Sequence, residues 1–262
     1  MIKVVIHGAL GRVGQEVLRA ASSDAELQAV GAVDIKAKSK KLTLPNGTEI
    51  PLSDDIDAML SSTKPDVMVD FTVYKAAMPA IRIAAKHKVN MVIGTTGFSK
   101  QDTDEIDTLC ASSKIGAIVA SNFAIGAILM IHMAKVASKY FDYAEIIEKH
   151  HEKKADAPSG TALSTAKAMV QARGKGFTMP PLEKETLAGT RGGQVDGISI
   201  HSLRMPGYMA NQDVIFGTLG QTLKISHETI SREAFMPGVI MAVKHVKENK
   251  GLIVGLENLL GL

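Results

Sequence analysis

The sequence contains no tryptophan and only one cysteine, Cys110, among its 262 residues. A single cysteine excludes an intramolecular disulfide and any zinc site built from several thiolates, and it favours a reducing compartment such as the cytoplasm. Aromatic residues make up only 4% of the chain, which argues against surfaces that stack single-stranded nucleic acid. The 30 basic and 27 acidic residues nearly balance, so the charge does not indicate a nucleic-acid partner.

The chain also lacks an uninterrupted apolar run of the length that a membrane span needs. Its most apolar stretch covers residues 115–137. Ser121, Asn122 and His132 interrupt that stretch, so we expect it to hold a buried strand, a loop and a buried helix. The amino terminus has no basic region followed by an apolar core, and we expect no signal peptide and no membrane partner.

Short apolar runs alternate with helical patterns through the first half of the chain. The expected strands cover residues 2–6, 27–33, 66–71, 90–94 and 115–119, and the helices between them begin at Arg12, near Ala76 and near Gln101. This alternation predicts an α/β domain, with a doubly wound parallel sheet covered by helices on both faces.

The second half has a different pattern. We expect a long apolar helix at 125–140, a strand at 144–151, a helix at 161–173, and three further strands at 197–204, 211–218 and 222–227. Because no helix separates the last three strands, this half predicts a smaller α+β domain with an antiparallel or mixed sheet. The tail from Ser231 returns to helical periodicity.

A glycine-rich loop joins the first strand to the first helix. Gly8, Gly11 and Gly14 allow a tight turn, and the helix start then offers free N–H groups to a pyrophosphate. Asp34 ends the second strand 20 residues past Gly14, where a ribose-binding carboxylate is expected. The alternative is a turn that serves packing alone, and the strand and helix on either side favour dinucleotide binding.

Two observations leave the choice between NADH and NADPH open. Asp34 favours a free 2′-hydroxyl and hence NADH. The lysines within residues 36–41 could offset a 2′-phosphate, or they could form an ordinary solvated loop.

Two further loops, residues 94–97 and 120–123, follow strands on the same expected edge of the sheet. They are either ordinary strand-ending turns or loops that approach the nicotinamide and its ribose.

The stretch EKHHEKKADAPSGTA combines positive charge with a helix start. Pro158 keeps the helix from extending backwards, and Ser159–Thr161 offers a cap and bare backbone for an anion. Lys154 adds a positive charge, while His150 and His151 can exchange protons near neutral pH. Adjacent histidines on a strand face opposite ways, so we expect no metal site. A solvated basic loop and a small-anion pocket with a proton donor both fit this local pattern.

At this point the residues resemble a known family. EIIEKHHEKKADAPSGTA is similar to the signature of the 4-hydroxy-tetrahydrodipicolinate reductase, or dihydrodipicolinate reductase, family of lysine and diaminopimelate biosynthesis. The resemblance extends along the chain through HGALGRVG, DFT, GTTG, SNF, RMPG, QDVIFG and FMPGV. It implies a Rossmann-like domain of residues 1–122 completed by 231–262, a substrate and oligomerisation domain of residues 123–230, and a homotetramer.

The resemblance also implies a role for individual residues. His150 would be the catalytic acid/base and Lys154 a second proton donor. The substrate dicarboxylate would be bound by His151, Ser159, Gly160 and Thr161. The nicotinamide cofactor, NADH or NADPH, would be held by Gly8, Ala9, Leu10, Gly11, Arg12, Val13, Gly14, Asp34, Gly94, Thr95, Thr96, Ala120, Ser121, Asn122 and Phe123.

Four positions depart from the family's usual pattern: Val13 replaces a common methionine, Ser121 a common proline and Asn211 a common histidine, and Ile35 stands where many members carry a basic residue. None of these changes removes an expected catalytic group.

Hinge closure is expected near residues 122–125 and 227–231, because cofactor and substrate would bind to different domains. Two rival hypotheses are another two-domain reductase and a nucleotide sensor without catalytic activity.

Overall fold

The computed structural model describes residues 1–262. The chain forms two compact units, the first of residues 1–125 and 232–262 and the second of residues 126–231. None of its helices has the length and apolar character needed to cross a bilayer.

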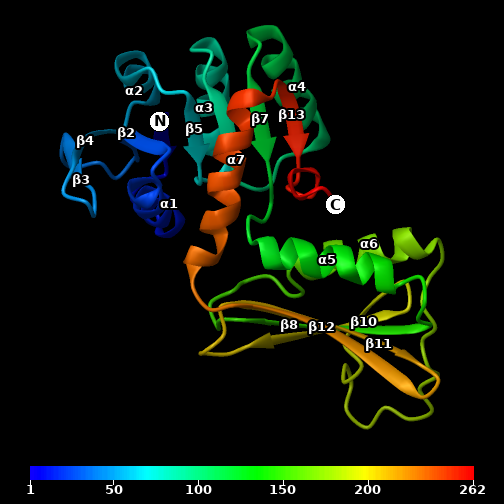
Figure 1. The fold of residues 1–262 in the computed structure, drawn as a ribbon. Helices are drawn as coiled ribbons and strands as arrows, with labels where there is room; N and C mark the ends of the chain where they lie inside the picture. Colours follow the sequence, from blue (N-terminus) through cyan, green and yellow to red (C-terminus); the bar gives the residue numbers. More distant parts are fainter. The chain divides into compact units, whose positions relative to one another are not determined.

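One sheet of eight strands forms the centre of the first unit, in the order β13-β7-β6-β5-β1-β2-β4-β3 (Figure 1). Its strands are β1 (Ile2–His7), β2 (Leu27–Val33), β3 (Lys41–Thr43), β4 (Glu49–Ser53), β5 (Val67–Asp70), β6 (Asn90–Ile93), β7 (Gly116–Val119) and β13 (Gly251–Val254). All neighbours run parallel except β3 and β4. The chain moves outward from β1 in both directions, so the ligand crevice of such a sheet is expected at the carboxyl ends of β1 and β5.

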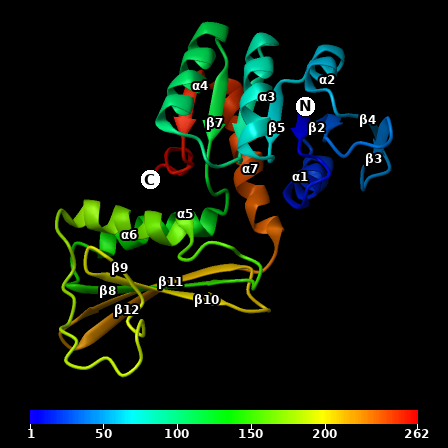
Figure 2. The ribbon, with the colours of Figure 1, turned by 180° about the vertical axis from the view of Figure 1, so that it is seen from behind.

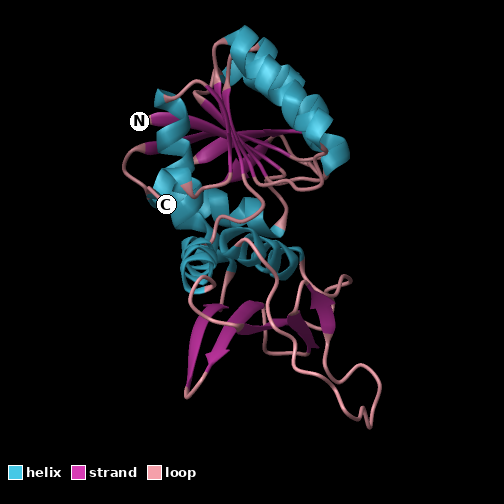
Figure 3. Ribbon diagram, turned by 90° about the vertical axis from the view of Figure 1, so that its right-hand side faces the viewer, coloured by secondary structure: helices cyan, strands magenta, loops and turns pink.

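Helices cover both faces of this sheet (Figure 3). The helices are α1 (Arg12–Ser23), α2 (Ile56–Thr63), α3 (Tyr74–Lys86), α4 (Lys100–Ser113) and α7 (Met236–Glu248), with short 3-10 turns η1 (Arg232–Phe235) and η2 (Asn258–Leu260). α1 packs with α7, whereas α3 packs with both α2 and α4. The inner strands are buried on both faces, which explains why they are continuous apolar runs rather than alternating ones.

The second unit is a five-stranded sheet with two helices on one face (Figure 2). Its elements are α5 (Ile125–Ala137), β8 (Tyr143–His150), α6 (Gly160–Arg173), β9 (Gly193–Val195), β10 (Ile198–Arg204), β11 (Ala210–Thr218) and β12 (Gln221–Thr229). The strand order is β12-β11-β8-β10-β9, and only β8 and β10 run parallel. Ile146 of β8 and Phe216 of β11 pack with Met169 of α6 in the core.

The predicted fold class is confirmed, since a largely parallel α/β sheet and a mixed α+β sheet are both present. The apolar stretch at 115–137 is indeed a strand, a loop and a helix, although α5 ends at Ala137, earlier than expected. The sequence patterns did not predict β3, β4, α2, β9 or β13. The tail in particular was expected to be helical, yet β13 follows α7 and pairs with β7.

Candidate active site

The glycine loop forms a tight turn between β1 and α1. Gly8 has φ +83°, a conformation that side chains disfavour, and its N–H donates to Val33 C=O over 2.8 Å. A Cβ on Gly14 would collide with the backbone of Gly8, so this glycine permits close packing of the helix on the loop. Gly11 precedes α1 without any side-chain cap, which leaves the first N–H groups of the helix free. These features fit a pyrophosphate.

Asp34 directly follows β2 beside this loop and is 8% exposed. Its Oδ2 accepts a hydrogen bond of 2.9 Å from Leu10 N–H, and its Oδ1 accepts one of 2.9 Å from Lys36 N–H. The carboxylate therefore holds the glycine loop against the second strand. Ile35 beside it is 91% exposed.

A second carboxylate, Asp70, lies wholly buried at the carboxyl end of β5. His7 Nδ1 at the end of β1 lies 2.5 Å from Asp70 Oδ2, and Thr95 Oγ1 after β6 donates to Oδ1 over 2.5 Å. Thr72 Oγ1 donates to the same carboxylate over 3.1 Å. Asp70 thus links the ends of three neighbouring strands at the expected cofactor edge.

The loops after β6 and β7 line a hollow of about 380 Å³ within the first unit. Thr95, Thr96 and Ser121 contribute to it from the two predicted loops. Gly255 and Glu257 line it from the segment after β13, and sequence reasoning missed both. Phe123 is buried and packs edge-on against Phe71, with ring centroids 5.5 Å apart.

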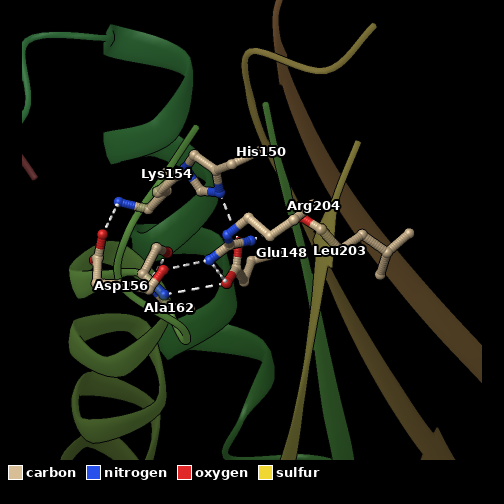
Figure 4. Close-up of polar contacts among 8 residues, drawn as sticks. Glu148, His150, Lys154, Asp156, Ala162, Leu203 and Arg204 are labelled. Atoms are coloured by element: carbon tan, nitrogen blue, oxygen red, sulfur yellow. Dashed lines mark hydrogen bonds and ion pairs between the residues drawn. The ribbon is translucent and has the colours of Figure 1, made fainter. Parts of the chain in front are cut away.

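In the second unit, strand alternation brings Glu148 and His150 onto one face of β8. Ala144 and Ile146 of that face are buried, and Glu148 continues the buried series with a fully buried side chain. His150 Nδ1 lies 2.6 Å from Glu148 Oε2 (Figure 4). Because an ionised carboxylate can only accept, the imidazole donates from Nδ1, and Nε2 is the nitrogen left for other partners.

Arg204 at the end of β10 neutralises Glu148. Its Nη1 and Nη2 donate to the two carboxylate oxygens over 2.8 and 2.7 Å. Burial raises the pKa of Glu148, but the hydrogen bonds from His150, Arg204 and Ser202 outweigh it and lower that pKa to about 2. Glu148 is therefore an ionised group at neutral pH.

The start of α6 lies against the same carboxylate. Ser159 N–H donates to Glu148 Oε1 over 3.1 Å, and Ser159 Oγ caps the helix by accepting from Ala162 N–H over 3.2 Å. Gly160 is exposed, and a side chain there would meet no atom within 4 Å, so space lies open in front of the helix start. The N–H groups of residues 160 and 161 remain available to an anion.

Lys154 lies on the loop between His150 and α6. Its Nζ donates to Asp156 Oδ1 over 2.7 Å, and that ion pair lowers the pKa of the Asp156 carboxyl. An ammonium has three protons, so Lys154 keeps two for a further acceptor. His151 follows the end of β8, is half-buried, and its C=O accepts from Lys154 N–H over 3.2 Å.

Each predicted set of residues is gathered within its own unit. The cofactor set, from Gly8 to Phe123, lies at the carboxyl edge of the large sheet, and the substrate set, from His150 to Thr161, surrounds the start of α6. Sequence reasoning missed His7, Asp70, Glu148 and Arg204. Glu148 did carry a signal, because the alternation of β8 puts a charged residue in a core register, and such a residue needs a buried partner.

Comparison with known proteins places the chain among nucleotide-dependent oxidoreductases with a Rossmann-type fold. Residues 2–123 match the family model described as dihydrodipicolinate reductase, N-terminus, and residues 126–260 match the C-terminus model of that family. The chain belongs to the dihydrodipicolinate reductase family.

Three relatives illustrate the similarity. The 4-hydroxy-tetrahydrodipicolinate reductase of Dehalococcoides mccartyi is 56% identical over 100% of this chain and 99% of its own. The enzyme of that name from Moorella thermoacetica is 47% identical over 99% of this chain and 98% of its own. The solved structure of dipicolinate-bound dihydrodipicolinate reductase from Paenisporosarcina sp. TG-14 has a TM-score of 0.88, with 39% identity over 98% of this chain and 99% of that one.

Proposed function

We propose that this chain reduces 4-hydroxy-tetrahydrodipicolinate to tetrahydrodipicolinate with a nicotinamide cofactor, as a step of lysine and diaminopimelate biosynthesis. Family membership supports the assignment. The observation that carries it is local to the second unit. A histidine backed by a buried carboxylate, a lysine and an open helix start lie on one short segment, residues 148–161. Those groups suit a small dicarboxylate that must receive a proton.

The first unit fits the cofactor. The uncapped start of α1 suits the pyrophosphate, and Asp34 lies where a ribose hydroxyl would be bound. When bound, NADH or NADPH supplies the hydride for an electron-poor ring carbon of the substrate. The hollow lined by Thr95, Thr96 and Ser121 suits the nicotinamide end because it opens at the same edge of the sheet.

The protein's own residues would orient the substrate and move a proton. Lys154 and the N–H groups at the start of α6 would clamp a carboxylate, which fixes the position of the ring. His150 would give its Nε2 proton to the reduced substrate, with Lys154 as the second donor. The hydroxyl of the substrate leaves as water together with a hydrogen from the neighbouring ring carbon, and it is this carbon that receives the proton from the enzyme after reduction. Substrate, one hydride and one proton thus give tetrahydrodipicolinate and water.

A single assay tests this proposal. NADH or NADPH absorbance is followed after addition of freshly generated substrate, with tetrahydrodipicolinate identified by mass spectrometry. A reductase of this kind oxidises the cofactor only when substrate is present. Cofactor binding without oxidation would instead indicate a nucleotide sensor. Oxidation with unrelated imines or aldehydes but not with this substrate would indicate a different two-domain reductase.

We also propose that NADH is the preferred cofactor. A 2′-phosphate would meet the negative charge of Asp34, whose oxygens are already held by Leu10 and Lys36. Ile35 contributes no cation there, although the lysines of residues 36–41 are close enough in sequence to permit some use of NADPH. The ratio of kcat/KM for the two cofactors tests the preference, and a ratio in favour of NADPH would contradict it.

A cytoplasmic homotetramer remains a proposal as well. No helix of the second unit covers the second face of its sheet, which carries charged residues such as Glu145, Lys149 and Lys224 together with Tyr143. We propose that this face pairs with other copies of the chain. Analytical ultracentrifugation of the full chain gives the test, since a monomer at working concentration would rule the assembly out.

A further inference from the structure

Glu148 is a buried charged residue that neither binds the substrate nor transfers a proton in the proposed reaction. It is a glutamate in the apolar register of a strand, with 0% of its side chain exposed. A charge in that environment is costly unless it is paired and fully hydrogen-bonded. Glu148 meets this condition with hydrogen-bonding partners from three parts of the chain: His150 of β8, Ser159 at the start of α6, and Arg204 of β10.

Each of these three partners leads to a different part of the proposed substrate site, and Figure 4 shows two of them, His150 and Arg204. His150 is the proposed proton donor, bound through Nδ1 at 2.6 Å. Ser159 is the cap of α6 and so sets the direction of the open helix start. Arg204 Nη2 donates to Asp156 C=O over 2.7 Å, and Asp156 in turn holds Lys154. One carboxylate and one guanidinium thus join all three groups.

We propose that Glu148, together with Arg204, is the positioning residue of the substrate site, which aligns the proton donor, the carboxylate cradle and the lysine loop with one another. The proposal rests on the proposed function for its chemistry, but the geometry that carries it lies entirely in the second unit. Neither residue needs to touch the substrate.

The tautomer of His150 follows from this arrangement. Glu148 bears no proton, so a neutral imidazole keeps its hydrogen on Nδ1 and leaves Nε2 bare. When the ring takes up a second proton, that proton is on Nε2, on the side away from the carboxylate. The ring of His150 therefore accepts and donates its exchangeable proton at Nε2.

A buried ion pair that serves only stability is the alternative. Such pairs are destabilising when one partner is removed, whatever their function. The two possibilities predict different values of kcat and KM for variants that remain folded. A purely structural pair leaves kcat and KM per folded molecule unchanged, whereas a positioning pair changes them even at temperatures where the variant is fully folded.

The first experiment compares Glu148→Gln with a control variant, Asp142→Asn. Asp142 lies just before β8, at the end of the strand opposite to His150, and it also pairs with an arginine, Arg173, at 2.9 Å. We expect Glu148→Gln to lower kcat by about 10²-fold or more and to weaken dipicolinate binding, with NADH affinity unchanged. Asp142→Asn should keep wild-type values for all three.

Unchanged kcat and dipicolinate affinity in folded Glu148→Gln would overturn the proposal, as would equal losses in both variants. Dipicolinate binding is measured by calorimetry and does not depend on turnover. If the wild-type chain fails to reduce the substrate, the proposed function falls. A selective loss of dipicolinate affinity in Glu148→Gln would still support the positioning role.

The second experiment needs no folded variant of Glu148. Nitrogen-15 NMR of the wild-type chain reports which ring nitrogen of His150 carries hydrogen, with its signals assigned by their loss in His150→Gln. We expect the neutral ring to be protonated at Nδ1. A neutral ring protonated at Nε2 would show that Glu148 does not orient the ring, and the proposal would be wrong.

Discussion

Both units carry a fully buried carboxylate beneath a histidine at the end of a strand. In the first unit Asp70 pairs with His7 Nδ1 at 2.5 Å, and in the second Glu148 pairs with His150 Nδ1 at 2.6 Å. The difference lies in the countercharge. Arg204 binds Glu148 with both of its terminal nitrogens, whereas the remaining partners of Asp70 are hydroxyl and backbone groups of Thr72 and Thr95.

This difference suggests two uses of one motif. A guanidinium stays charged at every accessible pH, so Glu148 remains ionised while its histidine gains or loses a proton. That suits a histidine that must give a proton away. Asp70 has His7 as its only ion-pair partner and otherwise binds loop hydroxyls, so it ties the β1, β5 and β6 ends together. That suits a rigid edge on which a cofactor is held.

The largest expected effect is on the chemistry of the second unit. Lys154→Ala removes a proposed proton donor and a carboxylate contact, so kcat should fall by about 10²- to 10⁴-fold. NADH affinity should stay the same, because every proposed cofactor residue lies in the first unit. Lys153→Ala is the matched control, since Lys153 is the exposed neighbour in the loop. Steady-state kinetics and NADH fluorescence titration measure both, and a parallel loss of NADH binding would count against the assignment.

The next largest effect distinguishes the roles of the two buried carboxylates, Asp70 and Glu148. Asp70→Asn leaves part of a buried hydrogen-bond network unsatisfied, which costs about 1–3 kcal/mol. We expect NADH to bind up to about 100-fold more weakly while dipicolinate binding is unchanged. Glu148→Gln should show the reverse pattern. Calorimetric titration of both ligands on both variants gives the test, and the comparison fails if either variant weakens the two ligands equally.

The sequence was informative wherever local pattern decides structure. Apolar runs located β1, β2, β5, β6 and β7. A helix cap was predicted at Ser159 or Thr161, and in the structure the cap is Ser159. The short strand β3 was missed because none of its three side chains is buried, and β4 was missed because Pro51 lies within its five residues. Their structure depends on pairing with each other and with β2.

The candidate site could be predicted only in part. The predicted ligand contacts lie in recognisable loops, so motif and resemblance could propose them, and they remain predictions. The pairing of Glu148 with Arg204 could not be predicted, because the two residues are 56 positions apart in the chain. Only the parallel register of β8 and β10, which sets Arg204 opposite His150, brings them together.

The stability of the folded chain should depend on pH in acid, because Glu148 is held in its ionised form by its partners. The pKa of this carboxyl, raised by burial but lowered more strongly by its hydrogen bonds to His150, Arg204 and Ser202, is about 2 in the folded chain against an ordinary 4.5. A lowered folded pKa contributes stability above pH 4.5, and that contribution is lost as the pH falls towards 2. Between pH 4.5 and 2, the free energy of unfolding measured in urea should fall more steeply for the wild type than for Glu148→Gln. The difference between the two slopes should correspond to the uptake of up to one proton on unfolding. Equal slopes would mean that Glu148 is not ionised.

The smallest expected effect concerns the cofactor's ribose and tests whether the first unit tolerates added charge. Ile35 is 91% exposed beside Asp34, so Ile35→Arg can introduce a guanidinium without disturbing packing. An exposed ion contact contributes about 0.2–1 kcal/mol, so kcat/KM for NADPH should rise up to about fivefold relative to that for NADH. Ile35→Gln, similar in length but uncharged, is the control. An equal gain in both variants would show that side-chain shape, rather than charge, sets the preference. Because the gain is electrostatic, it should shrink as salt is added.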